Sequence, residues 1–271
     1  MSLQPAFVQS ISIKGLRGQN EDKHNIILNI EGIKKDIANI NFYSIYDGHG
    51  GKYVSKYLSE TLYKYFLTKK TPYPLTKNYV YEVYNKIQNN LKKTNNANRT
   101  GSTGLVVINF RHNGENYLNI LNTGDSRCVL CRDNIAIPLT KDHKPHWPEE
   151  KTRIELLNGK ITFDGYDWRI NDLSVSRAFG DVDSTPFLTH IPDIFRYKLD
   201  KNDKFFVLAC DGLWDVMSNQ DVVNFIINNS YDLKTNTRIN KNTNIAKLLA
   251  EFALKKGSSD NISIIIVFIH Y

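Results

Sequence analysis

The chain has 271 residues, of which 41% are hydrophobic and 23% charged, and this composition is typical of a soluble globular protein with a sizeable core. The formal charge of +7 is modest and the lysines are dispersed, so we do not expect nucleic-acid binding, although a positive surface attracts phosphorylated partners. Three cysteines do not indicate a disulfide framework, and no apolar run approaches the roughly 18 residues that span a bilayer.

The first third of the chain predicts strands followed by helices. Its start, Met1-Ser2-Leu3-Gln4, has neither a signal-peptide pattern nor the Met-Gly start of a myristoylated protein, so we expect a cytoplasmic or nuclear location. Apolar residues recur at helical spacing over 52–67 and again over 80–91, which predicts two helices. The predicted strands are 7–13, 24–30 and 37–46.

The middle of the chain predicts two strand pairs and a helix. Pro148 opens a helix that runs to Leu157, and Gly159 stops it. The predicted strands are 105–110 and 117–121 around the turn His112-Asn113-Gly114-Glu115, then 128–131 and 135–139. The cysteines of Cys128-Val129-Leu130-Cys131 would face opposite sides of their strand, so a redox motif is not expected.

The last third ends in alternating strands and helices. A long polar loop over 228–244 has the composition of an insertion. The predicted elements are a strand at 205–210, helices at 220–227 and 245–256, and a strand at 262–269. Periodicity alone gives a mixture of α and β. Antiparallel neighbours and paired helices favour two sheets face to face with helices outside.

Several acids follow directly after predicted strands. Asp47 ends the strand 37–46 and is followed by Gly48-His49-Gly50-Gly51, and Asp211-Gly212 ends the strand 205–210 in the same way. Glycines let backbone carbonyls approach a bound group, and a carboxylate beside such a carbonyl suits Mg²⁺ or Mn²⁺. Each Asp-Gly taken singly is more often an ordinary polar turn.

Bringing such acids together is unfavourable unless a cation lies between them. Two carboxylates about 4 Å apart repel by about 4 kcal/mol at an effective dielectric of about 20. The chain has no cluster of cysteine and histidine at zinc spacing, so the ligands would be oxygen atoms only. We therefore infer a pair of Mg²⁺ or Mn²⁺ ions.

Eight motifs occur in the order found in the metal-dependent Ser/Thr protein phosphatases of type 2C, and the sequence resembles that family from about residue 10 to residue 268. No single motif is specific, but their number and order are. The motifs are Arg17 with Asn20-Glu21-Asp22, Asp47-Gly48-His49-Gly50-Gly51, Gly101-Ser102-Thr103, Gly124-Asp125-Ser126-Arg127, Asp142-His143-Lys144-Pro145, Ser176-Arg177-Ala178-Phe179-Gly180-Asp181, Asp211-Gly212-Leu213-Trp214-Asp215 and Asp260-Asn261.

The resemblance implies an α+β fold, a four-layer αββα sandwich of two mostly antiparallel β-sheets flanked by pairs of helices. It implies a single catalytic domain over 1–271, with a flap-like segment at roughly 148–189 that helps to choose substrates. The implied activity is hydrolysis of phosphoserine and phosphothreonine on proteins by a metal-bridging hydroxide, without a covalent intermediate. We expect a monomer whose partners are phosphorylated proteins.

The resemblance also implies a metal site with two ions and a weaker third. Asp47 is expected to bridge two ions, and the Gly48 carbonyl to bind one of them. The other implied metal-site residues are Asp211 and Asp260 as ligands of the second ion, Glu21 and Asp22 as acids that hold metal-bound waters, and Asp125 and Asp215 beside the third position.

Two residues are expected to act on the substrate. A guanidinium matches two phosphate oxygens at once, so Arg17 is the candidate phosphate clamp, although an arginine is more often a surface residue. His49 is the candidate general acid for the departing alkoxide, although a lone histidine is more often structural. Asp125 is expected to hydrogen-bond to His49.

The remaining matches are assigned to structure. Arg177 and Asp181 are expected to form a buried pair, and Asp142 and His143 to support the fold, His143 by capping a turn. The tryptophans Trp147, Trp168 and Trp214 are expected to pack rather than to bind substrate. Gly104 stands where relatives commonly carry alanine and is expected to loosen the local backbone.

Three functions of different class compete. The favoured one is an active protein phosphatase. The alternatives are a catalytically silent phosphoprotein-binding module and a metal-dependent hydrolase of small phosphoesters. The presence of every alignable metal-site residue argues against the silent module.

Overall fold

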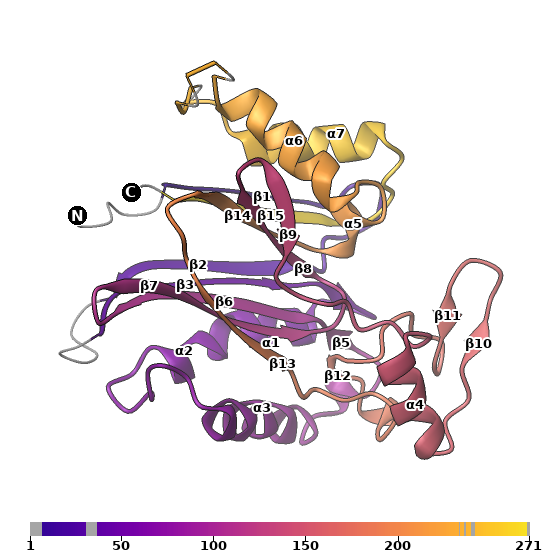
Figure 1. Ribbon diagram of the computed structural model, residues 1–271. Coiled ribbons are helices and arrows are strands. Elements are labelled where there is room, and N and C mark those ends of the chain that lie inside the picture. The colour runs from indigo at the N-terminus through magenta and orange to yellow at the C-terminus, as the bar shows by residue number, and fades with distance from the viewer. Residues whose placement is uncertain (1–6, 31–36, 233, 236, 240–241, 270–271) are drawn as a thin grey trace.

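The computed structural model describes residues 7–30, 37–232, 234–235, 237–239 and 242–269, so Met1-Ser2-Leu3-Gln4 lies outside the described residues. Two five-stranded antiparallel sheets lie face to face, and helices cover the outer face of each (Figure 1). This arrangement confirms the predicted four-layer sandwich.

The first sheet joins the two ends of the chain. Its first and last strands pair in register, from Phe7 opposite Phe268 to Ile13 opposite Ile262. The strands, in spatial order, are β1 (Phe7–Ile13), β15 (Ile262–Phe268), β14 (Asp203–Ala209), β8 (Arg127–Arg132) and β9 (Ile135–Pro138). All five were predicted.

The second sheet holds four predicted strands and one that was missed. The missed strand, β13, is half exposed along its length and carries polar residues between apolar ones, so its sequence lacks a buried run. The strands, in spatial order, are β13 (Asp193–Lys198), β7 (Glu115–Thr123), β6 (Gly104–His112), β3 (Ile37–Tyr46) and β2 (Lys23–Ile30).

Helices cover each sheet in a separate layer. The prediction of one helix over 52–67 was wrong, because Tyr65 N–H bonds to the Leu62 carbonyl three residues back and divides the segment in two. None of the helices in the described part of the chain could cross a membrane. The helices are α1 (Tyr53–Thr61), α2 (Tyr63–Phe66) and α3 (Lys77–Leu91) on the second sheet, and α5 (Asp211–Trp214), α6 (Asn219–Ser230) and α7 (Ile245–Lys255) on the first.

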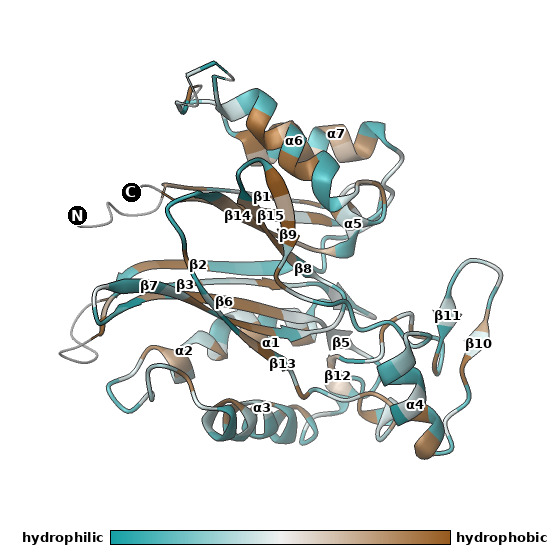
Figure 2. Cartoon of the chain, in the orientation of Figure 1, coloured by the Kyte–Doolittle hydropathy of each residue, from teal (hydrophilic) through white to brown (hydrophobic). Residues whose placement is uncertain are grey.

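Three apolar layers hold the sandwich together. The strands alternate side chains between the inner core and the helix-covered outer faces, and Figure 2 shows hydrophobic residues along both sheets. Tyr43 and Phe206 meet edge to face across the inner core, 5.6 Å apart. Cys128 belongs to that inner core and Cys131 to the layer beneath α6 and α7, which confirms that the two thiols face opposite sides.

One end of the sandwich carries the irregular elements. A small sheet is formed there by β4 (Gly48–His49), β5 (Gly101–Ser102) and β12 (Phe179–Gly180). The segment predicted to be flap-like, residues 148–189 (the flap), supplies β12 and also contains α4 (Pro148–Leu156), β10 (Thr162–Phe163) and β11 (Trp168–Arg169), which lie beside this sheet (Figure 1). These elements surround the ends of the strands that precede the predicted acids.

The packing prediction for the tryptophans was only partly right. Trp214 is buried against the first sheet, whereas Trp147 and Trp168 of the flap region are 38% and 41% exposed. Gly104 lies against an aromatic ring, since an added Cβ would come within 2.9 Å of Phe179 Cε2.

Candidate active site

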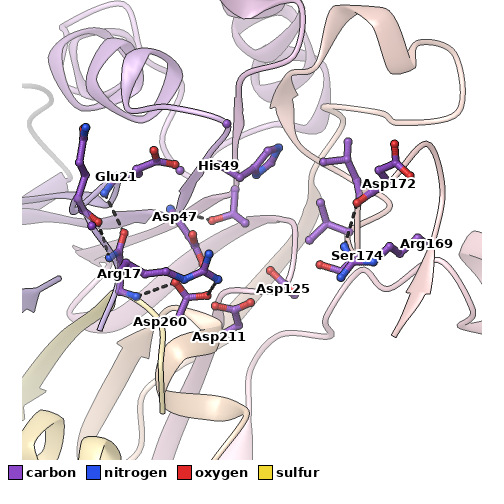
Figure 3. A pocket seen from close by; sticks show the side chains of 18 residues that line it. Arg17, Glu21, Asp47, His49, Asp125, Arg169, Asp172, Ser174, Asp211 and Asp260 are labelled. Carbon is purple, nitrogen blue, oxygen red and sulfur yellow. Dashed lines mark hydrogen bonds and ion pairs between the residues drawn. The ribbon is translucent and has the colours of Figure 1, made fainter. Parts of the chain in front are cut away.

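A cavity of about 560 Å³ opens at this end of the sandwich (Figure 3). Asp47 directly follows β3, Asp211 follows β14, and Asp260 lies two residues before β15. The flap completes the wall with Arg169 and residues 172–175. The predicted site residues that line the cavity are Arg17, Glu21, Asp47, Gly48, His49, Asp125, Asp211 and Asp260.

The floor of the cavity is an acidic cluster. The carboxylates of Asp47 and Asp211 and the thiol of Cys210 each offer an atom, and these atoms lie within 4.8 Å of one another. Burial raises the pKa of Asp47 well above its usual value, and repulsion from Asp211 adds to this. Burial also raises the pKa of Asp211, helped by the charge of Asp125. Two negative charges side by side at Asp47 and Asp211 are therefore unfavourable.

Glu21 and Asp22 stand at the edge of this cluster. Glu21 is fixed by the Gly51 N–H, which donates to Oε2 at 3.1 Å. Asp22 Oδ2 accepts from Ser263 Oγ at 2.6 Å, while its Oδ1 is buried without a hydrogen bond to any described residue. Burial raises the pKa of Asp22 to about 6. Asp22 lies behind the cavity wall rather than on it, since it is not among the lining residues.

Gly48 occupies a position that only glycine fits. An added Cβ would lie 2.5 Å from the Glu21 carbonyl oxygen and 2.8 Å from Ser55 Oγ. The absence of a side chain lets the backbone after Asp47 pass directly against the Glu21 loop. This close approach keeps Asp47 beside Glu21.

Arg17 reaches across the mouth of the cavity. Its Nη2 lies 2.7 Å from Asp260 Oδ2, and the Arg17 side chain is 60% exposed. Asn261 organises this edge, because its amide donates to the carbonyls of Lys14 and Gln19, each at 2.9 Å. The loop that carries Arg17 is thereby tied to the loop that carries Asp260.

His49 has a different partner from the one predicted. Its Nε2 lies 2.7 Å from Asp181 Oδ2, so the expected hydrogen bond to Asp125 was wrong. Burial lowers the pKa of His49, but Asp181 and the more distant charge of Asp125 outweigh it, so the pKa lies above its usual value. The sequence motifs do not show which of the two acids bonds to His49, because the fold brings both of them near the histidine.

Asp125 is instead bound by a lysine. Lys144 Nζ forms an ion pair with Asp125 Oδ2, and the lysine is largely buried. Asp215 does not line the cavity. Burial raises its pKa, and the charge of Lys144 opposes the shift, which places Asp215 in the same electrostatic neighbourhood. The third cation position predicted beside these acids thus already faces an ammonium group.

The predicted pair of Arg177 and Asp181 was wrong. Arg177 binds Glu150 at 2.6 Å and Asp193 at 2.9 Å, and so links the later part of the flap to α4 at its start and to β13. His143 fulfils its expected turn role, since its ring Nδ1 accepts from the Gly124 N–H at 3.1 Å and its backbone N–H donates to the Gly124 carbonyl at 3.1 Å. Asp142 pairs with Arg127 at 2.7 Å, which agrees with a structural role. These contacts hold the Gly124–Asp125 turn in place.

A family model described as Protein phosphatase 2C matches residues 7–262. The chain belongs to this family. The motifs, the sandwich and the cavity agree with that assignment, so the protein is a protein serine/threonine phosphatase of the 2C type whose metal dependence follows from the family.

Three relatives illustrate the range of similarity. A PP2C-like domain-containing protein of Acanthamoeba polyphaga mimivirus is 47% identical over 167 residues, covering 56% of this chain and 93% of its own length. Probable protein phosphatase 2C 7 of rice, Oryza sativa subsp. japonica, is 35% identical over 263 residues, covering 96% of this chain but only 65% of its own length. Protein phosphatase 1B of Rattus norvegicus is 31% identical, covering 94% of this chain and 68% of its own length.

Solved structures share the fold. The serine-threonine phosphatase 2C of Toxoplasma gondii superposes with a TM-score of 0.77 at 22% identity, over all of this chain and 96% of that one. A Caenorhabditis elegans sex-determining protein reaches a TM-score of 0.83 at 23% identity, over 98% of this chain and 65% of that one. At these identities the likeness confirms the architecture alone.

The cavity of this 2C-type phosphatase is suited to divalent cations. Its donors are carboxylates, which Mg²⁺ and Mn²⁺ prefer. The raised pKa values of Asp47 and Asp211, together with an Asp22 Oδ1 that has no hydrogen bond within the described part of the chain, are what a buried acid cluster shows when positive charge is lacking. The residues present therefore fit the metals that the family implies.

Sequence reasoning missed four contributors to this site. Asp181 and Asn261 lay within recognised motifs, but their contacts are set by segments far away in the chain. Lys144 lay in a recognised motif without any assigned role. Arg169 carries no motif at all, and only the folded flap brings it to the cavity wall.

Proposed function

We propose that this chain hydrolyses phosphoserine and phosphothreonine in proteins, using the cavity lined by Asp47, Asp211 and Asp260 as a site for two Mg²⁺ or Mn²⁺ ions. The observation that supports it is the gathering of acids from distant strand ends in one cavity with Arg17 and His49. Two divalent ions bound there would lower the pKa of water enough for it to attack phosphorus near neutral pH.

Arg17 is proposed to bind the phosphate. Its guanidinium is largely exposed at the cavity mouth, and Asp260 is its one hydrogen-bond partner among the described residues. It can therefore turn two parallel N–H donors onto phosphate oxygens when substrate enters. Binding of this kind acts mainly on substrate affinity.

His49 is proposed to protonate the leaving oxygen. A serine or threonine alkoxide is a poor leaving group, and a positioned general acid contributes about 10²- to 10⁴-fold. The ring lies on the cavity wall two residues after Asp47, and the His49 side chain is 27% exposed, so a substrate can reach it.

Glu21 and Asp22 are proposed to hold water around the acids. Both are fixed, by Gly51 and Ser263 respectively, before any ligand enters. The third cation position beside Asp125 and Asp215 stays a prediction, and Lys144 would compete for it. A monomeric state and a cytoplasmic or nuclear location likewise stay predictions.

A turnover assay separates the candidate functions. The purified chain is tested on a phosphothreonine peptide and on p-nitrophenyl phosphate, with Mn²⁺ and then with excess EDTA. We expect peptide hydrolysis that requires Mn²⁺. No turnover of either compound would favour the silent binding module, and a preference for the small ester would favour a small-phosphoester hydrolase.

A matched pair of variants connects the activity to the cavity. Asp47→Asn should abolish turnover, whereas Asp133→Asn should leave it unchanged. Asp133 lies at the far end of β8, in a turn with φ of +50°, a conformation that asparagine also adopts readily. Full activity in Asp47→Asn would overturn the proposed site.

A further inference from the structure

The ion pair between His49 and Asp181 is built into the backbone of the site. The Nε2–Oδ2 distance is 2.7 Å, and the Asp181 side chain is 3% exposed. The pair lies directly over Gly101, where an added Cβ would stand 1.9 Å from Asp181 Oδ2 and 2.4 Å from His49 Nε2. Gly101 therefore leaves the space that the two side chains occupy.

Short strands position both partners, since His49 lies in β4 and Asp181 comes directly after β12. His49 is paired with Gly101 between β4 and β5, and Gly180 is paired with Gly101 between β12 and β5. The Asp181 N–H donates to the Thr100 carbonyl at 3.1 Å, and its own carbonyl accepts from Ser184 N–H at 2.9 Å. The backbone thus fixes the carboxylate relative to the imidazole.

This contact selects one ring nitrogen. A carboxylate accepts hydrogen bonds only, so Nε2 carries a hydrogen whether the ring is neutral or charged. Among the described residues none hydrogen-bonds to Nδ1, which is therefore the nitrogen available to the cavity. Orientation by a carboxylate on the opposite nitrogen is a known way to aim an imidazole.

We propose that Asp181 is a positioning residue that aims His49 so that Nδ1 delivers the proton to the leaving oxygen. The inference rests on the proposed function and names the atom through which it works. As the bond between phosphorus and the ester oxygen breaks, the Nδ1 proton passes to that oxygen and gives the alcohol. The oxygen of water forms the new bond to phosphorus, and its proton leaves to solvent. His49 ends neutral with its hydrogen on Nε2, and a proton from water restores it.

The test uses leaving groups of different quality. Asp181→Asn keeps the size of the side chain, and asparagine tolerates the left-handed backbone of this position, where φ is +43°. Its amide can present NH₂ to Nε2, so the contact no longer requires a hydrogen on that nitrogen and no longer fixes the ring as a carboxylate does. We expect kcat for the phosphothreonine peptide to fall about 10- to 100-fold, with KM nearly unchanged. For p-nitrophenyl phosphate, whose leaving group needs no proton, we expect a loss of less than about threefold.

Two further variants distinguish positioning from general damage. Asp183→Asn changes an acid two residues away that is 50% exposed and paired with Arg99, and it should behave like the unmodified protein. Gly101→Ala places a Cβ against both members of the ion pair and should separate them without changing either residue. It should therefore also lower kcat more for the phosphothreonine peptide than for p-nitrophenyl phosphate, which keeps the inference testable if Asp181→Asn does not fold. Mn²⁺ should raise the melting temperature of Asp181→Asn as much as that of the unmodified protein.

The double variant His49→Gln with Asp181→Asn is decisive. If Asp181 acts through His49, the double variant is no slower than His49→Gln alone. Additive losses, or equal losses on both substrates in Asp181→Asn and Gly101→Ala, would overturn the inference. If His49→Gln itself shows no dependence on the leaving group, the general-acid part of the proposed function fails instead.

Discussion

Replacing Asp211 with asparagine should make the protein more stable without metal and less stable with it. The Asp47 and Asp211 ligand atoms lie within 4.8 Å of each other. At an effective dielectric of about 20, two full charges at that separation repel by at least about 3 kcal/mol. Attraction from Lys144 and the position of Asp211 in the first turn of α5 offset about 1 kcal/mol of this.

Protonation and solvent screening reduce the effect further, because the raised pKa values let the cluster take up a proton. We therefore expect Asp211→Asn in EDTA to gain about 1 to 2 kcal/mol in free energy of unfolding. For a chain of this size that corresponds to a rise of roughly 2 to 6 °C in melting temperature.

With Mn²⁺ the order should reverse. A ligand at about 100 times its Kd stabilises the folded state by about 2.7 kcal/mol, and Asp211→Asn should lose most of this gain. Differential scanning fluorimetry at pH 7.5, in EDTA and in a Mn²⁺ titration, measures both effects on the same sample. Asp133→Asn serves as the control and should follow the unmodified protein.

Two results would refute this reasoning. If Asp211→Asn melts below the unmodified protein in EDTA, Asp211 contributes a stabilising contact and not an unrelieved repulsion. If Mn²⁺ stabilises both proteins equally, the ion binds elsewhere.

Three other changes test separate parts of the structure. Arg17→Ala should raise KM for the phosphothreonine peptide about tenfold, the worth of one charge-assisted contact, with kcat changed less; an unchanged KM in steady-state assays would remove its clamp role. Gly104→Ala should lower the melting temperature by a few degrees, because its Cβ would lie 2.9 Å from the Phe179 ring, while Mn²⁺-dependent activity is retained; an unaltered melt would show that the ring moves aside. Burial lowers the pKa of His190 to about 4, so below pH 6.5 the unfolded chain binds this proton more tightly than the folded protein does. The folded state is therefore expected to lose at most about 3 kcal/mol of stability from this residue as the pH falls from 6.5 toward 4. Denaturant melts of His190→Gln over that range should show a shallower pH dependence than the unmodified protein, and identical slopes would contradict the assignment.

The sequence predicted the acids well because they stand in motifs at strand ends. Asp47 and Asp211 each follow a buried strand and precede a glycine. A pattern of this kind involves only residues that are adjacent in sequence, so it can be read without knowing the tertiary structure. The layers were predictable for a related reason, since core strands such as β6, β14 and β15 each contain a run of apolar residues. Recognition of the family then supplied the order of the layers.

Contacts between distant segments could not be predicted in this way. The partner of His49 depends on β5 lying between β4 and β12, three strands of two residues each that have no periodicity. Asp125 and Asp181 both stand in recognised motifs and were both candidate partners of His49. The register of that small sheet places Asp181, and not Asp125, against the imidazole. Lys144 was missed similarly, because its ion pair with Asp125 needs the Gly124 turn to meet the loop before α4.

The most direct test of the metal site is a crystal soaked in Mn²⁺ and measured at the manganese absorption edge. We expect two anomalous peaks inside the cavity, one between the carboxylates of Asp47 and Asp211 and one within bonding distance of Asp47. Peaks confined to other surfaces, with Asp47, Asp211 and Asp260 bound only to water or to Arg17, would contradict the account.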